Sequence, residues 1–200
     1  MQEVLFFLCL LTLPVTFNLL FPYSLSSVHK IEQQNESGWV KHKGLYRNHV
    51  YNFSVFIPKG KIGISSRPPN PDHGIKIMLD EADVSHLWAT AIYDSTGLGS
   101  LDNIVADQLK SFTADKKIIV KSINSTMTVK RRLATRLTIE YKSDENTEVM
   151  VQDSIYILKK PVSKGSDTGT LYELVLITQK QNYLSHKQLL ESMLKSWEIK

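Results

Sequence analysis

The chain has 200 residues, of which 42% are apolar and 22% are charged, an ordinary balance for a globular protein. Its formal net charge of +4 is mild and no concentrated basic stripe is present, so nucleic-acid binding is not expected. The only cysteine, Cys9, lies in an apolar N-terminal stretch. The rest of the chain is therefore without a disulfide, a cysteine nucleophile or a thiolate metal site.

The apolar N-terminal stretch predicts export. It is followed by Ser24 and Ser26, small residues at the minus-three and minus-one spacing of a signal peptidase site. We interpret residues 1–26 as a signal peptide and expect a periplasmic or secreted protein. The alternative is an uncleaved membrane anchor, because residues 4–21 are close to the minimum length of a membrane span. That anchor would then be the expected contact with a membrane.

A polar spacer separates this segment from a single domain. Residues 27–44 lack apolar periodicity, which is typical of a flexible linker. Residues 45–200 are enough to bury one core. The domain opens with a strand-like alternation that Pro58 and Gly60 end, and its apolar positions are Tyr51, Phe53, Val55 and Ile57.

The rest of the domain alternates strand-like and helix-like stretches. After a proline-containing loop, strands are predicted at 75–79, 87–94, 117–123, 133–141, 148–158 and 170–178. A helix between the second and third of these begins at Ser100, its predicted N-cap, and carries Asp102 in its first turn. A second helix is predicted within residues 185–200, where Ser185 and Gln188 have capping-box spacing.

This layout predicts an α+β domain in which a mostly antiparallel β-sheet is flanked by helices. The 170–178 strand has apolar residues on both faces, which indicates a central strand covered on both sides. No GxSxG elbow, P-loop or dinucleotide fingerprint occurs, and the histidines lack HxH or HxxxH spacing. We therefore predict no catalytic residue, no metal ligand set and no cofactor.

Several features occur in the order of a known fold. The chain has the aromatic strand "YNFSVFIPKG", an Ala-x-Arg element at Ala134 and Arg136, two long strands, and a last helix that ends in Ser196 and Trp197. Over residues 45–199 it resembles the PsbP-like fold. That fold is shared by the PsbP protein of photosystem II, the yeast nuclear-import factor that binds the GTPase Ran, and many uncharacterised bacterial exported proteins. The resemblance implies an α/β/α sandwich with a binding or accessory role.

Two positions depart from the pattern of that family. Lys61 stands where a tryptophan is usual, and the glycine that usually turns the hairpin before the Ala-x-Arg element is replaced near Arg131. The second change matters because only glycine adopts a positive φ without cost. Members of the family do not share a site, so the resemblance carries no functional residue over to this chain.

The densest positive cluster is the first candidate binding site. Lys130, Arg132 and Arg136 would share one face of a strand, where they could bind a phosphate, a carboxylate or an acidic protein surface. The alternative is a hairpin tip whose charges keep it soluble and prevent edge-to-edge pairing.

The proline-rich loop between Arg67 and Gly74 is the second candidate, because long, rigid loops on a sheet often carry function. Asp72 and His73 are adjacent in this loop and could supply two metal ligands, although a solvated acidic turn is the favoured interpretation.

These observations favour a non-enzymatic, exported module that binds a protein or cell-envelope partner through loops at one end of its sheet. The alternatives are a metal- or small-ligand-binding protein and a hydrolase whose site follows no known motif. An enzyme needs ionisable groups that converge in a deep cleft, whereas an interaction module presents a shallow exposed patch.

Overall fold

The computed structural model describes residues 39–66, 73–81, 84–93, 99–143, 148–160 and 169–200. All of them belong to one compact unit, Glu36–Lys200. The predicted signal peptide or anchor and the first part of the predicted linker lie outside the described residues. Among the helices that are described, none has the length and apolar character needed to cross a membrane.

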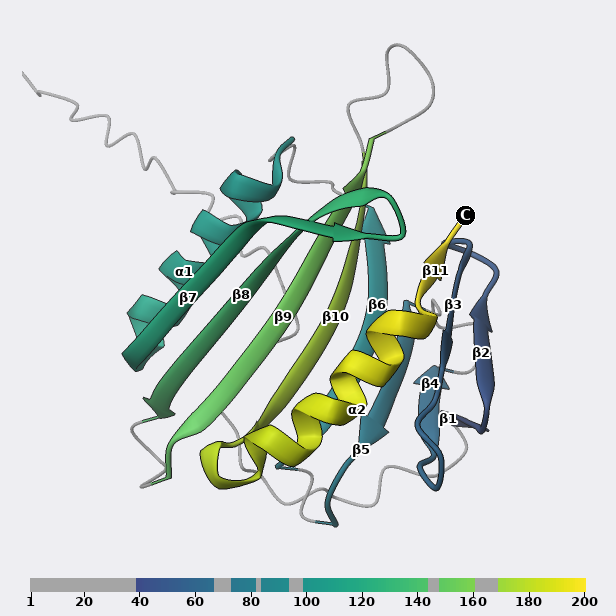
Figure 1. The fold of residues 1–200 in the computed structure, drawn as a ribbon, viewed down its shortest axis with the longest axis horizontal. Coiled ribbons are helices and arrows are strands. Elements are labelled where there is room, and N and C mark those ends of the chain that lie inside the picture. Colours follow the sequence, from purple (N-terminus) through teal and green to yellow (C-terminus); the bar gives the residue numbers. More distant parts are fainter. Residues whose placement is uncertain (1–38, 67–72, 82–83, 94–98, 144–147, 161–168) are drawn as a thin grey trace, which may run out of the picture. The chain divides into compact units, whose positions relative to one another are not determined.

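Eight antiparallel strands form the large sheet, in the order β1-β4-β5-β6-β10-β9-β8-β7 (Figure 1). In the same order, the strands span Trp39–His42, Gly63–Ser66, Gly74–Met78, His86–Tyr93, Thr170–Gln179, Met150–Lys159, Arg132–Ser143 and Lys116–Val129. The inner strand β10 has Leu174 and Leu176 in one core and Val175 and Ile177 in the other. The predicted α+β class is therefore confirmed, as is the prediction of a central strand covered on both faces.

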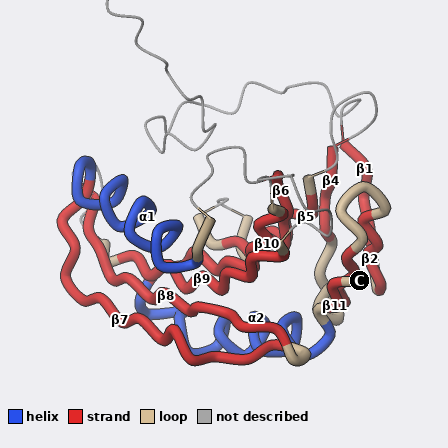
Figure 2. Tube along the Cα trace, turned by 90° about the horizontal axis from the view of Figure 1, so that it is seen from above, coloured by secondary structure: helices blue, strands red, loops and turns tan. Residues whose placement is uncertain are grey.

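The two helices lie on opposite faces of the large sheet (Figure 2). Helix α1 (Leu101–Asp115) packs on β7, β8 and β9. Its predicted cap is present, since the Ser100 hydroxyl oxygen accepts a hydrogen bond from the Asn103 N–H (3.2 Å). Helix α2 (Tyr183–Ser196) packs on β10 and on the strand β3 (Phe53–Phe56). The arrangement is the expected α/β/α sandwich.

A second, three-stranded sheet lies beside α2 and has the order β11-β3-β2. Strand β2 (Leu45–Asn48) forms a hairpin with β3, and β11 (Glu198–Ile199) returns from the far end of the sequence to pair with β3. The Phe56 N–H also donates to the Ser196 hydroxyl oxygen (3.0 Å). The sheet therefore joins the beginning of the domain to its last residues.

Each face of the large sheet has its own apolar core. Because the domain has no cysteines and therefore no disulfides, burial of these side chains is the main source of its stability. The core on the α2 side combines the two sheets and the helix through buried side chains that include Tyr51, Phe53, Val55, Ile57, Ile155, Ile157, Leu174, Leu190, Met193 and Trp197. The core on the α1 side includes Ile104, Val105, Phe112, Leu137, Ile139, Tyr141, Val175 and Ile177. The alternating positions predicted for the opening strand are all buried.

Three local predictions need correction. Trp39–His42, placed in the linker by its sequence, forms β1 and pairs with β4, because four residues are too few to show a period. The capping box of the last helix is wrong, since α2 begins at Tyr183 and the Ser185 hydroxyl donates to the Asn182 carbonyl oxygen (2.8 Å). Gly63–Ser66, at the start of the stretch predicted as a proline-containing loop, forms β4.

The β7–β8 hairpin closes without a glycine. Its turn residues, Lys130 and Arg131, have φ values of 47° and 69°, and Val129 pairs directly with Arg132. A left-handed backbone costs a residue other than glycine about 1–2 kcal/mol. The two strands, of 14 and 12 residues, hold the turn closed in spite of this cost.

Arg131→Gly is therefore expected to raise the free energy of unfolding by about 0.5–1 kcal/mol, because relief of the left-handed strain outweighs the added freedom of the unfolded chain. Urea unfolding followed by circular dichroism measures the change. Thr128→Gly, which places the same residue within β7, is the matched control and is expected to lower stability. A loss of stability in Arg131→Gly would show that the turn is not strained.

Candidate binding site

One end of the domain gathers aromatic and basic side chains from five separate elements. Tyr93 ends β6, His73 precedes β5, and Tyr51 lies in the β2–β3 turn. Arg132 begins β8, and Tyr172 lies near the start of β10. We call these five residues the tyrosine end. Antiparallel pairing brings them together, because the end of one strand lies beside the start of the next.

Ring contacts and hydrogen bonds connect the aromatic members of the tyrosine end. The Tyr51 hydroxyl and His73 Nδ1 are joined by a hydrogen bond of 2.9 Å, and the two ring centroids are 5.6 Å apart. The centroid of the Tyr93 ring lies 5.2 Å from that of the Tyr51 ring. Beneath them, the Tyr172 hydroxyl donates to the Tyr51 carbonyl oxygen (2.8 Å). The rings of His73 and Tyr93 are thus held in place by the buried side chain of Tyr51, which Tyr172 supports in turn.

Burial keeps the inner phenols neutral. It raises the pKa of Tyr51, and the neighbouring Tyr93 raises it further. The pKa of Tyr172 is raised by burial as well, although the positive charge of Arg132 opposes the shift. Both hydroxyls therefore keep their protons at physiological pH and remain hydrogen-bond donors.

Exposed apolar side chains and positive charges lie around the tyrosine end. Tyr93 and Val50, the latter in the β2–β3 turn, are both 57% exposed. His73 and Lys130 are also exposed. The surface is open and combines aromatic, aliphatic and cationic groups, which is the composition of a protein-interaction surface.

Hydrogen bonds to the backbone of the last two residues hold the tyrosine end in place. Arg132 Nη2 donates to the carbonyl oxygen of Ile199 (3.1 Å), and Lys159 Nζ donates to that of Lys200 (2.6 Å). The Lys200 N–H in turn donates to the carbonyl oxygen of Asn52, next to Tyr51 (2.9 Å). Asn52 itself has a φ of 54°. The hairpin, the end of β9 and the β2–β3 turn are therefore held in one arrangement.

Half of the candidate residues selected from the sequence lie at this end. His73 and Arg132 are members of the tyrosine end, and Lys130 lies in the adjacent hairpin turn. Arg67 and Asp72 lie outside the described residues. Arg136 is four positions further along β8 and binds acidic side chains beneath α2 instead.

Arg136 belongs to an ionic network beneath α2. Its Nε and Nη2 donate to the two carboxylate oxygens of Asp153 on β9 (2.8 and 2.6 Å), and its Nη1 donates to Glu191 of α2 (2.7 Å). Thr138 and Tyr183 also donate to Asp153, at 3.2 and 2.8 Å. Arg136 therefore ties β8, β9 and α2 together, and its cation is satisfied within the protein.

The network shifts the pKa values of two of its members, Arg136 and Tyr183. The hydrogen bond with Asp153 is the largest cause that raises the pKa of Arg136, and burial opposes it. The pKa of Tyr183 is raised first by burial and then by the negative charge of Asp153. Asp153 has a fully buried side chain, whereas that of Arg136 is 17% exposed. The pair is a buried, bidentate salt bridge.

A second row of hydrogen-bonded side chains contains a threonine, a histidine and a serine, residue types that also occur in the active sites of hydrolases. The Thr178 hydroxyl contacts His186 Nδ1 (2.7 Å) and donates to the Ser85 hydroxyl oxygen (3.1 Å). Ser85 and Thr178 have no exposed surface, so neither hydroxyl is open to a substrate. The row instead connects α2 to β10 and to the residue before β6. Within the part of the chain that the structure describes, no group of three or more metal-ligating side chains occurs.

The carboxyl group of Glu173, in β10, lies on the α1-side face of the large sheet. Its neighbours across β6 and β9 are Thr90 and Tyr156. Burial raises the pKa of Glu173 to about 7, and a hydrogen bond with Thr90 lowers it in part. The side chain keeps some solvent exposure, so the energetic cost of its charge is smaller than complete burial would impose.

Comparisons with known proteins agree with this fold. No family model matches the sequence, and no curated protein matches it significantly. The chain is similar in structure to cyanobacterial PsbP (CyanoP) from Synechocystis sp. PCC 6803, with a TM-score of 0.51 and 13% identity over 86% of this chain and 99% of that one. The domain therefore has the PsbP-like fold that its sequence resembles.

Two other solved structures are more distant. PA94 from Pseudomonas aeruginosa, a protein of unknown function, has a TM-score of 0.39 at 13% identity and covers 77% of this chain and 94% of its own. LpqN, involved in cell envelope biogenesis of Mycobacterium tuberculosis, has a TM-score of 0.39 at 10% identity and covers 84% and 87%. Such similarities describe a fold and identify no shared site.

The sequence did not reveal the three tyrosines of the tyrosine end. From the sequence, Tyr51 and Tyr172 are ordinary core positions of strands, and Tyr93 is an apolar position near the end of another. Their separation along the chain hides that they meet. The usable signal was the position of Tyr93 at a strand terminus, where an aromatic side chain remains exposed.

Asp153→Asn is expected to lower the free energy of unfolding by about 3 kcal/mol, because it leaves the Arg136 cation without its buried counter-charge. Urea unfolding at pH 7 measures this. Glu140→Gln, which breaks the exposed pair with Lys180, is the matched control and is expected to cost less than about 1 kcal/mol. Equal effects of the two substitutions would contradict the role given to the buried pair.

Glu173→Gln is expected to change how stability depends on pH. Because the folded-state pKa of about 7 lies above the ordinary value of 4.5, ionisation of Glu173 opposes folding, and its cost develops as pH rises through this window. The substitution should therefore add nothing near pH 4.5 and stabilise the protein at pH 8, by at most about 3 kcal/mol. Unfolding measured from pH 5 to 8 tests this, with the exposed Asp107→Asn as control. A pH-independent difference would contradict the prediction.

Proposed function

We propose that this protein is an exported, non-enzymatic accessory module that binds a protein partner through the tyrosine end. The observation that carries the proposal is the contact between the exposed Tyr93 and the buried Tyr51, whose rings lie 5.2 Å apart. An aromatic side chain that is already held in place loses little entropy on binding, which is typical of interface hot spots.

The charges around the tyrosine end favour an acidic partner. Lys130 and Arg131 are exposed in the hairpin turn, and Arg132 lies next to them. Positive groups at the rim of an interface increase the rate of association with a negatively charged surface. The apolar Val50 would contribute to the part of the contact from which water is excluded.

The openness of the tyrosine end favours a protein over a small ligand. A small-molecule site encloses most of its ligand in a concave pocket. Tyr93 and Val50 are instead more than half exposed, and His73 is exposed as well. A broad partner surface would cover all three.

Export is supported by the apolar N-terminal stretch of the sequence. Ser24 and Ser26 define a cleavage position, so the mature protein is expected to begin at Ser27. N-terminal sequencing of the protein isolated from the cells that produce it tests this. Recovery of the protein with residues 1–26 intact would contradict cleavage and favour the anchor.

Site-specific photo-crosslinking tests the binding proposal. A benzophenone amino acid is introduced at Tyr93, at Val50, or at Leu184, which is 77% exposed in α2 and serves as the control. Crosslinking in living cells is expected to give one common adduct from positions 93 and 50 and none from 184. The partner, identified by mass spectrometry and purified, should bind the wild-type protein and lose at least about tenfold in affinity for Tyr93→Ser.

Two results would overturn the proposal. One is an identical set of adducts from all three positions, which would indicate contact without a defined surface. The other is turnover of ester or phosphate substrates by the purified protein that His73→Ala abolishes, because this would establish catalysis at the tyrosine end.

A further inference from the structure

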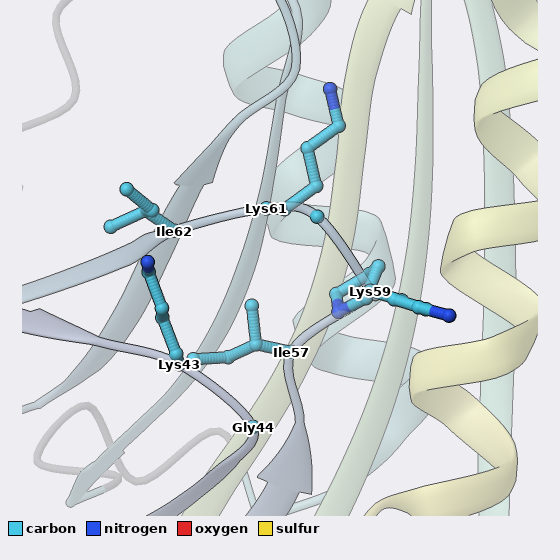
Figure 3. A pocket seen from close by; sticks show the side chains of 8 residues that line it. Lys43, Gly44, Ile57, Lys59, Lys61 and Ile62 are labelled. Atoms are coloured by element: carbon cyan, nitrogen blue, oxygen red, sulfur yellow. The ribbon is translucent and has the colours of Figure 1, made fainter.

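A cleft of about 500 Å³ lies next to the end of β3 that is further from Tyr51 (Figure 3). It is lined by Lys43 and Gly44, which connect β1 to β2, and by Ile57–Ile62, which connects β3 to β4. Strand β3 separates the two sites, since Tyr51 comes before it and Ile57 directly follows it. The cleft contains none of the candidate residues selected from the sequence.

Two glycine-containing turns build the cleft. Gly44 and Gly60 have φ values of 73° and 82°, and a Cβ atom at either position would meet no atom within 4 Å. The Lys61 N–H donates to the Pro58 carbonyl oxygen (3.0 Å), which closes the second turn. The Ile57 N–H donates to the Gly44 carbonyl oxygen (2.8 Å) and joins the two turns. The space above both glycines is therefore open, while the backbone around it is fixed.

The cleft has an apolar floor and cationic walls. Ile57 and Pro58 are buried, and Ile62 is 43% exposed. Lys43 and Lys59 are exposed, and Lys61 is held in place because its Nζ donates to the Leu79 carbonyl oxygen (3.1 Å). Figure 3 shows that the three lysine side chains extend in separate directions and do not converge on one point.

The titratable groups of His186 and Asp80 face Lys61. His186 of α2 has a lowered pKa, caused first by burial and then by Lys61, while Asp80 opposes the shift. A lowered pKa keeps His186 uncharged at neutral pH. The carboxylate oxygens of Asp80 accept hydrogen bonds from the Val84 and Ser85 N–H groups (3.0 and 2.9 Å), which hold Asp80 in its own turn. Its negative charge offsets part of the charge of Lys61 and leaves Lys43 and Lys59 as the exposed cations of the cleft.

We propose that this cleft binds an extended acidic peptide segment of a partner protein, in which one aliphatic side chain is flanked by Asp or Glu residues. The aliphatic side chain would contact Ile57 and Ile62, and the flanking carboxylates would reach Lys43 and Lys59 on separate sides. A single phosphate would need cations that converge on one point. A flat membrane surface would reach the lysine tips and leave the concave floor empty.

The cleft is independent of the tyrosine end in position and in chemistry. One site presents exposed aromatic rings, and the other presents a concave aliphatic floor between lysines. A module with both could hold two partners, or two parts of one partner, at the same time and gain avidity from the pair.

Fluorescence anisotropy with a defined peptide tests the proposal. The probe is a fluorescein-labelled, C-terminally amidated peptide of sequence Asp-Glu-Ile-Asp-Glu, and its uncharged counterpart is Asn-Gln-Ile-Asn-Gln. The acidic peptide is expected to bind the wild-type protein at least about tenfold more tightly, and to weaken as salt rises because exposed charges are screened.

Charge-reversal variants locate the site. Lys43→Glu/Lys59→Glu is expected to reduce affinity for the acidic peptide by at least about tenfold. Lys110→Glu/Lys142→Glu makes the same charge change at exposed positions of α1 and β8 and should leave affinity within about twofold. Circular dichroism confirms that both variants are folded. Tyr93→Ser should bind the peptide like the wild type, so that failure here and failure at the tyrosine end are distinguishable.

Three outcomes would overturn the inference. The first is absence of binding by the acidic peptide at low salt. The second is equal loss of affinity in the two charge-reversal variants, which would indicate attraction by net charge alone. The third is sedimentation with phosphatidylserine vesicles that Lys43→Glu/Lys59→Glu abolishes while peptide binding persists, because this would assign the lysines to a lipid surface.

Discussion

The bidentate salt bridge between Arg136 and Asp153 is the constraint on which the positions of the other elements depend. It lies beneath α2, and Arg136 also binds Glu191 of that helix, so the helix is fixed at one orientation on the sheet. A hydrophobic stripe alone would allow α2 to slide or rotate, because apolar contacts carry little direction. The residues after α2 then enter β11, which pairs with β3 and supports the turn that carries Tyr51. The geometry of the tyrosine end therefore depends on an ion pair whose arginine lies four positions along β8 from Arg132.

The same dependence explains why the two proposed sites differ in character. The tyrosine end forms where strands stop, and its aromatic rings are positioned by phenols buried in the core. The lysine-lined cleft forms between two glycine turns that a backbone hydrogen bond joins, so its shape is set by local chain geometry. One site is a product of long-range packing and the other of short-range turns.

Periodicity and capping chemistry were sufficient to predict most elements. The alternation of Tyr51, Phe53, Val55 and Ile57 and the two apolar faces of β10 depend on local sequence, as does the Ser100 cap, and these features agree with the structure. Arg136 could not be assigned correctly, because its carboxylate partners lie 17 and 55 positions away. The hairpin at Lys130–Arg131 forms against the backbone preference of its residues, since long paired strands outweigh a strained turn. The meeting of three tyrosines from three elements required the tertiary structure itself.

The pairing of β3 with β11 has a consequence for the way the protein is made. Ser196, which accepts a hydrogen bond from Phe56, is 140 positions later in the sequence. During synthesis the β2–β3 hairpin emerges early and then waits, with one open edge and unsatisfied backbone groups, until nearly all of the remaining domain has been translated. The three-stranded sheet is therefore completed only after α2 and the residues of β11 have been made.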